Sequence, residues 1–170
     1  ELYFLIVKGN SNINNFSELK NGFSRKETNY IIGTGNENSG SFYILKLLCK
    51  YYNINLIKFD LEKENTNNKN GNLYYIDKDI NYNYNLLLNN KIDALFYISG
   101  PKLSYTLNIS NLVPLKFINL NNLDNFTKVS GITTKKESIN TLENIITNET
   151  KYIDTQATRS ILICNKNLDT

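Results

Sequence analysis

The glycine- and serine-rich stretch between residues 30 and 52 holds the groups best suited to bind an anion. Gly33, Gly35 and Gly40 favour a turn, and a helical pattern follows from Ser41. Ser39 or Ser41 is predicted to cap this helix, because a hydroxyl accepts hydrogen bonds from the free N–H groups of a first turn. Those N–H groups and the positive end of the helix dipole attract negative charge. Alternatively, glycine and serine serve only to form the turn, as in many α/β proteins.

Two nucleotide-binding motifs come close to this stretch, but neither is complete. A P-loop needs a lysine after its second glycine; Gly35 and Gly40 have the required spacing, but Ser41 stands at the lysine position. A dinucleotide-binding G-x-G-x-x-G motif could start at Gly33 and Gly35, but Asn38 occupies the place of the third glycine. The sequence therefore favours a carboxylate or a single phosphate as the anion.

The composition of the 170-residue chain narrows the chemistry further. The chain has no His, so it has no Ser-His triad and no imidazole base, and its net charge of +3 comes without a basic run typical of nucleic-acid binding. Glu37, Asp60 and Asp93 could act as acid or base, but no nucleophile–base pair or metal cluster accompanies them. We expect a binding protein without cofactor or metal rather than an enzyme. Cys49 and Cys164 lie in apolar surroundings typical of buried thiols, and a disulfide between them is the alternative.

Strands and helices are predicted to alternate around this loop. The predicted strands are 2–7, 30–32, 55–60, 92–98, 113–118 and 157–164, with 73–76 a strand or a packed loop and 62–72 a loop or insertion. The predicted helices are 13–20, 41–52, 79–90 (capped by Asp77 or Asp79), 103–109, 119–129 and 135–146. This alternation indicates an α/β fold with a largely parallel sheet. Ligands of such sheets bind beyond the carboxyl ends of the strands, so the loops after Ile32 and Ile98 are expected to converge.

The order of motifs resembles the TAXI family of extracytoplasmic solute receptors, which serve tripartite ATP-independent periplasmic (TRAP) transporters. The resemblance is carried by an ordered set of segments: 5–8, 12–22, 32–33 with 38–41, 88–96 with Gly100-Pro101, and finally 155–163. The resemblance implies a type 2 periplasmic-binding-protein fold, in which a largely parallel sheet is flanked by helices and strands cross at a hinge. It also implies a periplasmic protein that captures a small carboxylate, either a glutamate-like amino acid or a dicarboxylate, and delivers it to membrane permease subunits.

The resemblance also implies a division of the chain, which would then be partial. Residues 1–29 would form a hinge strand and the start of a lobe, 30–118 the second, ligand-binding lobe, and 119–170 an incomplete return segment to the first lobe. Segments 2–7 and 157–164 would cross at the hinge. A ligand-sensing regulatory domain of the same fold is the alternative function.

The predicted ligand-binding residues lie on the two loops and at two tyrosines. They are Gly35, Ser39, Gly40, Ser41, Tyr97, Ser99, Gly100, Pro101 and Tyr152. Pro101 stands where the family usually has a histidine. Glu37 would repel a carboxylate ligand unless its side chain points away.

Overall fold

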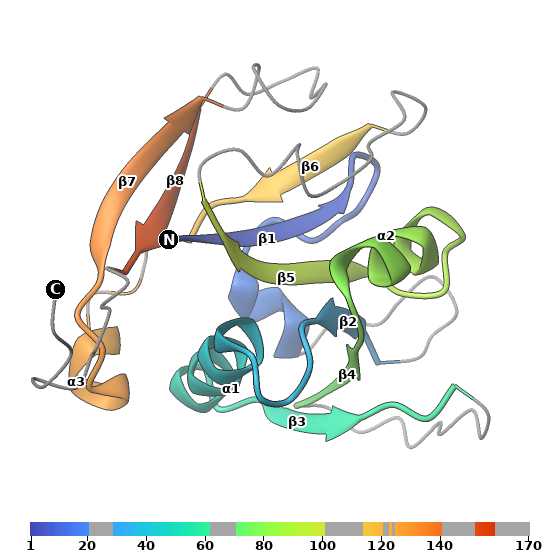
Figure 1. The fold of residues 1–170 in the computed structure, drawn as a ribbon, viewed down its shortest axis with the longest axis horizontal. Helices are drawn as coiled ribbons and strands as arrows, with labels where there is room; N and C mark the ends of the chain where they lie inside the picture. The colour runs from blue at the N-terminus through green and yellow to red at the C-terminus, as the bar shows by residue number, and fades with distance from the viewer. Residues whose placement is uncertain are drawn as a thin grey trace, which may run out of the picture.

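A mixed eight-stranded sheet organises the part of the chain that the computed structural model describes, residues 1–20, 29–61, 71–100, 114–120, 123, 125–140 and 152–158 (Figure 1). The strand order is β3-β4-β2-β5-β1-β8-β7, and β6 also pairs with β1. The strands are β1 (Leu2–Lys8), β2 (Ile31–Thr34), β3 (Asn55–Lys58), β4 (Asn72–Asp77), β5 (Ala94–Ser99), β6 (Leu115–Ile118), β7 (Lys135–Asn140) and β8 (Tyr152–Ala157). The helices are η1 (Phe16–Lys20, a 3-10 helix), α1 (Gly40–Tyr51), α2 (Ile80–Leu88) and α3 (Phe126–Ser130). The α/β class is confirmed.

The sheet combines a parallel group with antiparallel pairs. Strands β3, β4, β2 and β5 are parallel neighbours, as expected for strands joined by helical crossovers. In contrast, β1 pairs antiparallel with β5, β6 and β8, and β7 pairs antiparallel with β8. The prediction of a largely parallel sheet is therefore correct only for the half of the sheet that carries the glycine-rich loop.

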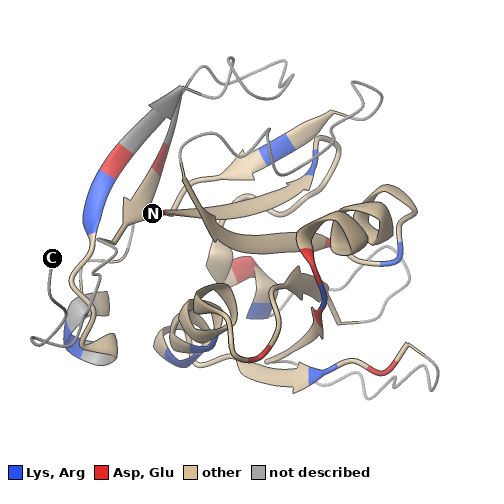
Figure 2. Ribbon diagram, in the orientation of Figure 1, with Lys and Arg blue, Asp and Glu red and all other residues tan. Residues whose placement is uncertain are grey.

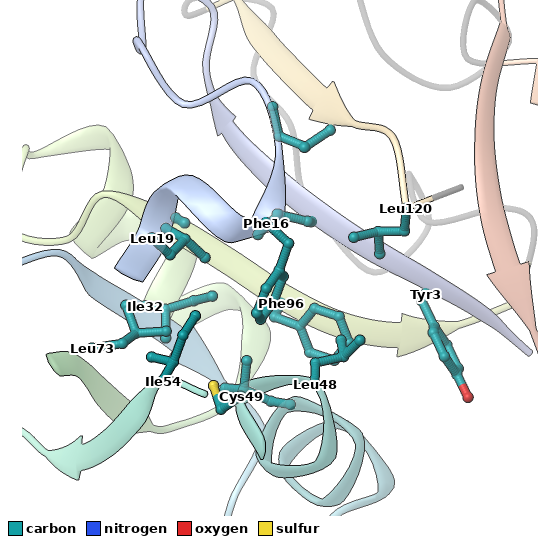
Figure 3. Packing of buried hydrophobic residues seen from close by; sticks show 14 of the residues in the cluster. Tyr3, Phe16, Leu19, Ile32, Leu48, Cys49, Ile54, Leu73, Phe96 and Leu120 are labelled. Atoms are coloured by element: carbon teal, nitrogen blue, oxygen red, sulfur yellow. The ribbon is translucent and has the colours of Figure 1, made fainter. Parts of the chain in front are cut away.

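Strand β1 is buried on both faces because helices cover both sides of the sheet. Its side chains alternate between two apolar clusters: Tyr3 and Leu5 pack with α1 and η1, whereas Phe4 and Ile6 pack with α2. The predictions of a doubly buried strand at 2–7 and of a helical segment with Phe16 inward are confirmed. Figure 3 shows the larger cluster, in which side chains from the sheet, η1 and α1 meet.

Asparagine ends both of the longer helices. Asn53 follows α1 and Asn90 follows α2, each with a φ of 54°. Asparagine tolerates this left-handed conformation better than most residues, so it can take the place of glycine at a helix end. The side chain of Lys8 also donates to the carbonyl of Leu88 at 2.8 Å, which supplies a positive charge at the negative end of α2.

The C-terminal part departs most from the sequence predictions. Residues 135–140 form strand β7, not the start of a helix, because they pair along their whole length with β8. The last described strand is β8 at Tyr152–Ala157, earlier than the predicted 157–164, of which 159–164 lie outside the described residues. Of the helix predicted at 119–129, the described residues contain only the short α3. The predicted helix at 103–109 and loop at 62–70 also lie outside the described residues.

Candidate functional site

The loop after β2 leads directly into α1, and Ser39 caps this helix. The Ser39 hydroxyl accepts a hydrogen bond from the backbone N–H of Phe42 at 3.1 Å. The Ser39 N–H donates in turn to the carbonyl of Asn36 at 2.8 Å, which closes the loop. Of the two predicted capping residues, Ser39 is therefore the cap.

Two glycines at the end of β2 allow close packing, each against a different neighbour. A Cβ atom at Gly35 would lie 2.4 Å from Oγ of Ser39, so only glycine fits beneath the capping residue. Gly33 was predicted to belong to the loop but is part of β2, where an added Cβ would lie 2.7 Å from Cβ of Asn83. Gly35 therefore belongs to the candidate site, and Gly33 serves the packing of α2.

Ser41 joins the start of α1 to the end of β5. Its side chain is buried, and its hydroxyl accepts a hydrogen bond from the N–H of Ile98 at 2.9 Å. Since β2 and β5 are parallel neighbours, their carboxyl ends lie side by side and α1 starts above both. This arrangement confirms that the loop after Ile32 and the end of β5 converge.

The first turn of α1 leaves backbone donors unpaired. No acceptor for the N–H groups of Gly40 and Ser41 is present among the described residues, as expected at the start of a helix. Gly40 is exposed, and an added Cβ would meet nothing within 4 Å. Thr34, just before the loop, is fully buried and its hydroxyl has no partner within the described ranges. The site thus offers two N–H donors, one from the exposed Gly40 and one from the buried Ser41.

A charged cluster next to the loop fixes the position of Glu37. We call Glu37, Lys58, Tyr75 and Asp77 the Glu37 cluster; its side-chain contacts join the loop before α1 to the ends of β3 and β4. Figure 2 shows where basic and acidic residues lie along the described ribbon. Nζ of Lys58 lies 2.9 Å from Oε1 of Glu37 and 2.9 Å from Oδ2 of Asp77. The hydroxyl of Tyr75 donates to the same Glu37 oxygen at 2.9 Å. Two donors therefore hold the carboxylate of Glu37, the group expected to repel a carboxylate ligand.

The electrostatics of the cluster follow from these contacts. Hydrogen bonds from Lys58 and then Tyr75 lower the pKa of Glu37 below its usual value of 4.5. The same contact raises the pKa of Lys58 well above its usual range. Burial, followed by the bond to Glu37, raises the pKa of Tyr75 to about 12, so its hydroxyl stays protonated and can donate at neutral pH. The cluster therefore combines one ammonium with two carboxylates.

Tyr97 does not join the loop residues. Its side chain belongs to the apolar cluster under α2, on the opposite face of the sheet from α1. The Tyr97 hydroxyl donates to the carbonyl of Lys78 at 2.9 Å and accepts from the Asn83 amide at 2.7 Å. Burial raises the pKa of Tyr97 far above its usual value. We therefore assign Tyr97 to the core, which corrects its predicted role as a ligand contact.

Asn83 is an important residue that sequence reasoning did not single out. It is completely buried on α2, and its amide nitrogen lies within 3.3 Å of the carbonyls of Thr34, Ile76 and Lys78. These contacts fix the carboxyl ends of β2 and β4 against α2. The available signal was its helical spacing, which places Asn83 on the same face as Leu87.

The remaining predicted contacts are dispersed. Ser99 ends β5 opposite Leu2 and follows Ile98, so alternation directs its side chain to the face away from α1. Gly100 is exposed next to Ser99, and Pro101 lies outside the described residues.

Tyr152 starts β8, five residues and about 16 Å along the strand from Ala157, the residue that pairs with β1. The structure thus unites Gly35, Ser39, Gly40 and Ser41, and the role of Tyr152 stays a prediction.

Asp93, one of the carboxylates considered for catalysis, has a structural role. Oδ2 of Asp93 accepts from the N–H of Ile31 at 2.9 Å, which ties the start of β5 to β2. Cys49 is a buried free thiol, and burial raises its pKa to about 12. Within the described ranges, no group of three or more Cys, Asp or Glu side chains could hold a metal ion. The same residues contain no helix with the length and apolar character of a membrane span.

Comparisons with known proteins leave the family open. No family model matches the sequence, and the search of curated proteins gave no match. Two solved structures of XAC2383 from Xanthomonas citri, bound to chloride ion and to ATP, are similar with TM-scores of 0.46 and 0.44 and identities of 15% and 12%. The aligned region covers 56% of this chain but only 31% and 32% of those chains. Scores this low carry no argument about ligand or function.

Proposed function

We propose that this chain contains, at residues 30–118, the ligand-binding lobe of an extracytoplasmic solute receptor that captures a small carboxylate. The proposal rests on one observation: the backbone N–H groups of Gly40 and Ser41, beside the end of β5, have no acceptor among the described residues. A helix N-terminus beyond the carboxyl end of parallel strands is a favourable place for a negative group. In this proposal the lobe has the type 2 periplasmic-binding-protein fold and is similar to TAXI receptors.

The contrast between the two longer helices supports this choice of site. The N-terminus of α2 is capped by the carboxylate of Asp79, which accepts from the N–H of Tyr82 at 2.9 Å. The N-terminus of α1 is capped by the neutral hydroxyl of Ser39, and its first turn contains no acidic residue. The positive end of the α1 dipole is therefore left for an external anion, whereas that of α2 is already compensated.

The position of β1 supports the proposed hinge. Consecutive strand–helix–strand units produce parallel strands, so an antiparallel strand next to β5 enters the sheet by another route. Strand β8 lies beside it, and Glu1 and Thr158 exchange two hydrogen bonds of 2.9 Å. In the proposal these two strands connect the lobe to a second lobe, and closure of the lobes traps the ligand. A TRAP-type permease in the membrane then receives the carboxylate from the periplasmic receptor, and no catalytic step occurs.

Calorimetric titration with L-glutamate, L-glutamine and succinate tests the proposal. Gly40→Val places a branched side chain in open space next to the N–H donors, so it blocks the ligand without disturbing the core. Asn81→Val makes a similar change at an exposed position in the first turn of α2 and serves as the matched control. Loss of one hydrogen bond to a charged ligand weakens binding about ten- to hundredfold.

The expected result is saturable binding that Gly40→Val weakens and Asn81→Val leaves unchanged. Absence of binding by the wild-type full-length protein, with both lobes, to all three compounds would reject the carboxylate receptor. Equal affinities of the wild type and Gly40→Val would reject α1 as the site. Thermal unfolding provides a cross-check, since a ligand at a hundred times its Kd adds about 2.7 kcal/mol of stability.

A further inference from the structure

Glu37 occupies a position from which it could compete with a ligand. It lies in the exposed loop two residues before Ser39, close in sequence to the N–H groups of Gly40 and Ser41. A carboxylate near a helix N-terminus is attracted by the same donors and dipole that would attract an external anion. An unrestrained Glu37 side chain is therefore a competitor present in the loop itself, if α1 binds an anion as proposed above.

Two donors from neighbouring strands bind the carboxylate of Glu37. Lys58 lies at the end of the edge strand β3, and Tyr75 lies on β4. Both contact the same carboxylate oxygen of Glu37 at 2.9 Å. The carboxylate is thus turned toward β3 and β4, which lie on the side of β2 away from β5.

Tyr75 and Lys58 are themselves held in place. Tyr75 is 8% exposed, and its ring packs on that of Phe42 with a centroid distance of 4.9 Å. Phe42 lies in the first turn of α1, so Tyr75 joins this turn to the Glu37 carboxylate. Lys58 has a second anchor at Asp77, whose carboxylate is largely buried with 20% of its side chain exposed. Both donors therefore have a defined geometry from which to restrain a loop side chain.

We propose that Lys58 and Tyr75 are positioning residues that hold Glu37 away from the N-terminus of α1 and so keep it open for a carboxylate ligand. This inference rests on the proposed function of α1. Neither residue touches the ligand; both act through Glu37. Release of Glu37 would let its carboxylate approach the N–H groups of Gly40 and Ser41, where it would exclude or repel an external carboxylate.

A direct electrostatic effect of Lys58 on the ligand must be separated from its effect on the position of Glu37. Removal of Lys58 also removes a positive charge that attracts any anion, whether or not Glu37 moves. That direct effect is the same in the presence and absence of Glu37, so it is additive with a change at Glu37. The positioning effect requires Glu37 and is therefore not additive, and a double-mutant cycle distinguishes the two.

The experiment uses the full chain and the wild type, Lys58→Met, Glu37→Gln and the double variant, titrated with L-glutamate and with succinate. Lys58→Met should weaken binding about two- to fivefold, the range expected for a carboxylate at a helix terminus. In the Glu37→Gln background only the direct charge effect remains, so the same substitution should weaken binding less than in the wild type. Tyr75→Phe, which alters no charge, should weaken binding in the same direction. Lys46→Met removes an equal charge from an exposed position on α1 and is the control.

Backbone amide NMR shifts give a readout that needs no ligand. In Lys58→Met the shifts of Gly40 and Ser41 should move as Glu37 approaches them, and they should return in the double variant. Unchanged amide shifts, or an equal effect of Lys58→Met in both Glu37 backgrounds, would overturn the positioning role. If the wild type binds neither ligand, the proposed function fails, and the amide shifts alone then decide whether Lys58 restrains Glu37.

Discussion

Substitution of Gly35 by alanine should destabilise the fold by disturbing the cap of α1. The added Cβ would lie 2.4 Å from Oγ and 3.0 Å from Cβ of Ser39. The Ser39 hydroxyl must then rotate and give up its hydrogen bond from Phe42, or the loop must shift. Loss of a serine cap costs about 1 kcal/mol, and overpacking costs about 1–3 kcal/mol. We therefore expect Gly35→Ala to lower the free energy of unfolding by about 1–3 kcal/mol.

Urea unfolding followed by circular dichroism measures this change, and Gly40→Ala is the matched control. A Cβ at Gly40 meets nothing within 4 Å and lies in the first turn of a helix, so alanine should leave stability unchanged or raise it by up to about 1 kcal/mol. Ser39→Ala alone should cost about 1 kcal/mol. Because that variant has already lost the cap, Gly35→Ala should cost about 1 kcal/mol less in the Ser39→Ala background than in the wild type.

Two results would contradict the reasoning. A change below about 0.5 kcal/mol for Gly35→Ala is typical of an open surface position and would mean that the close approach to Ser39 is not maintained in solution. Additive costs of Gly35→Ala and Ser39→Ala would mean that the added methyl group does not act through the cap.

Three further predictions concern groups away from the helix start. Tyr97→Phe should cost about 1 kcal/mol of stability in urea unfolding, through loss of the hydrogen bond to the Lys78 carbonyl, and should leave ligand affinity unchanged. The pKa of Glu37 is lowered in the folded state, first by the hydrogen bond from Lys58, so the Glu37 carboxylate is protonated at a higher pH in the unfolded chain than in the folded one. The contribution of Glu37 to stability is therefore present above pH 4.5 and is lost as the pH falls through the folded pKa. Glu37→Gln should therefore flatten the acid limb of the stability curve. With Cys164 replaced by serine, a thiol reagent at pH 8 should label Cys49 only after unfolding, because burial raises its pKa to about 12 and covers the sulfur.

The elements with strong local patterns were predicted from the sequence. Strand β1 is a continuous apolar run, and α1 combines a glycine-rich start with apolar residues at helical spacing. In both cases the local preference and the tertiary environment agree, because both elements bury an apolar surface against the same cluster. The cap at Ser39 was predictable for the same reason, since the residue type, the following helix and the preceding turn point to one conformation.

The β7–β8 ribbon could not be predicted from local pattern alone. The spacing of Ile139, Leu142 and Ile145 favoured a helix, but residues 135–140 pair with 152–157 as a strand. The stability of such a ribbon comes from cross-strand pairs that are distant in sequence, and a local window does not contain the partner. The β-branched residues Ile153 and Thr155 in Tyr152–Ala157 were the missed indication of a strand.

The polar residues of the core were the second gap. Asparagine is frequent in this chain, so the sequence alone does not single out Asn83, although its amide lies within 3.3 Å of three backbone carbonyls. For Tyr97 the alternation of the strand was the deciding information: it shares a face with Leu95, under α2, and not with Phe96, under α1. Which helix covers which face became known only with the structure.

The central position of β1 has a consequence for folding during synthesis. This apolar strand is made long before its partners β5, β6 and β8, whereas the parallel strands β2, β3 and β4 can pair among themselves as they emerge. At ordinary rates of translation, β1 waits about 5–20 s for β5. During that interval its six buried side chains and both backbone edges are exposed, which makes it the segment most prone to aggregate and the one a chaperone would protect. Strand β1, which is central in the folded sheet, is thus also the segment with the greatest risk of aggregation before β5 is made.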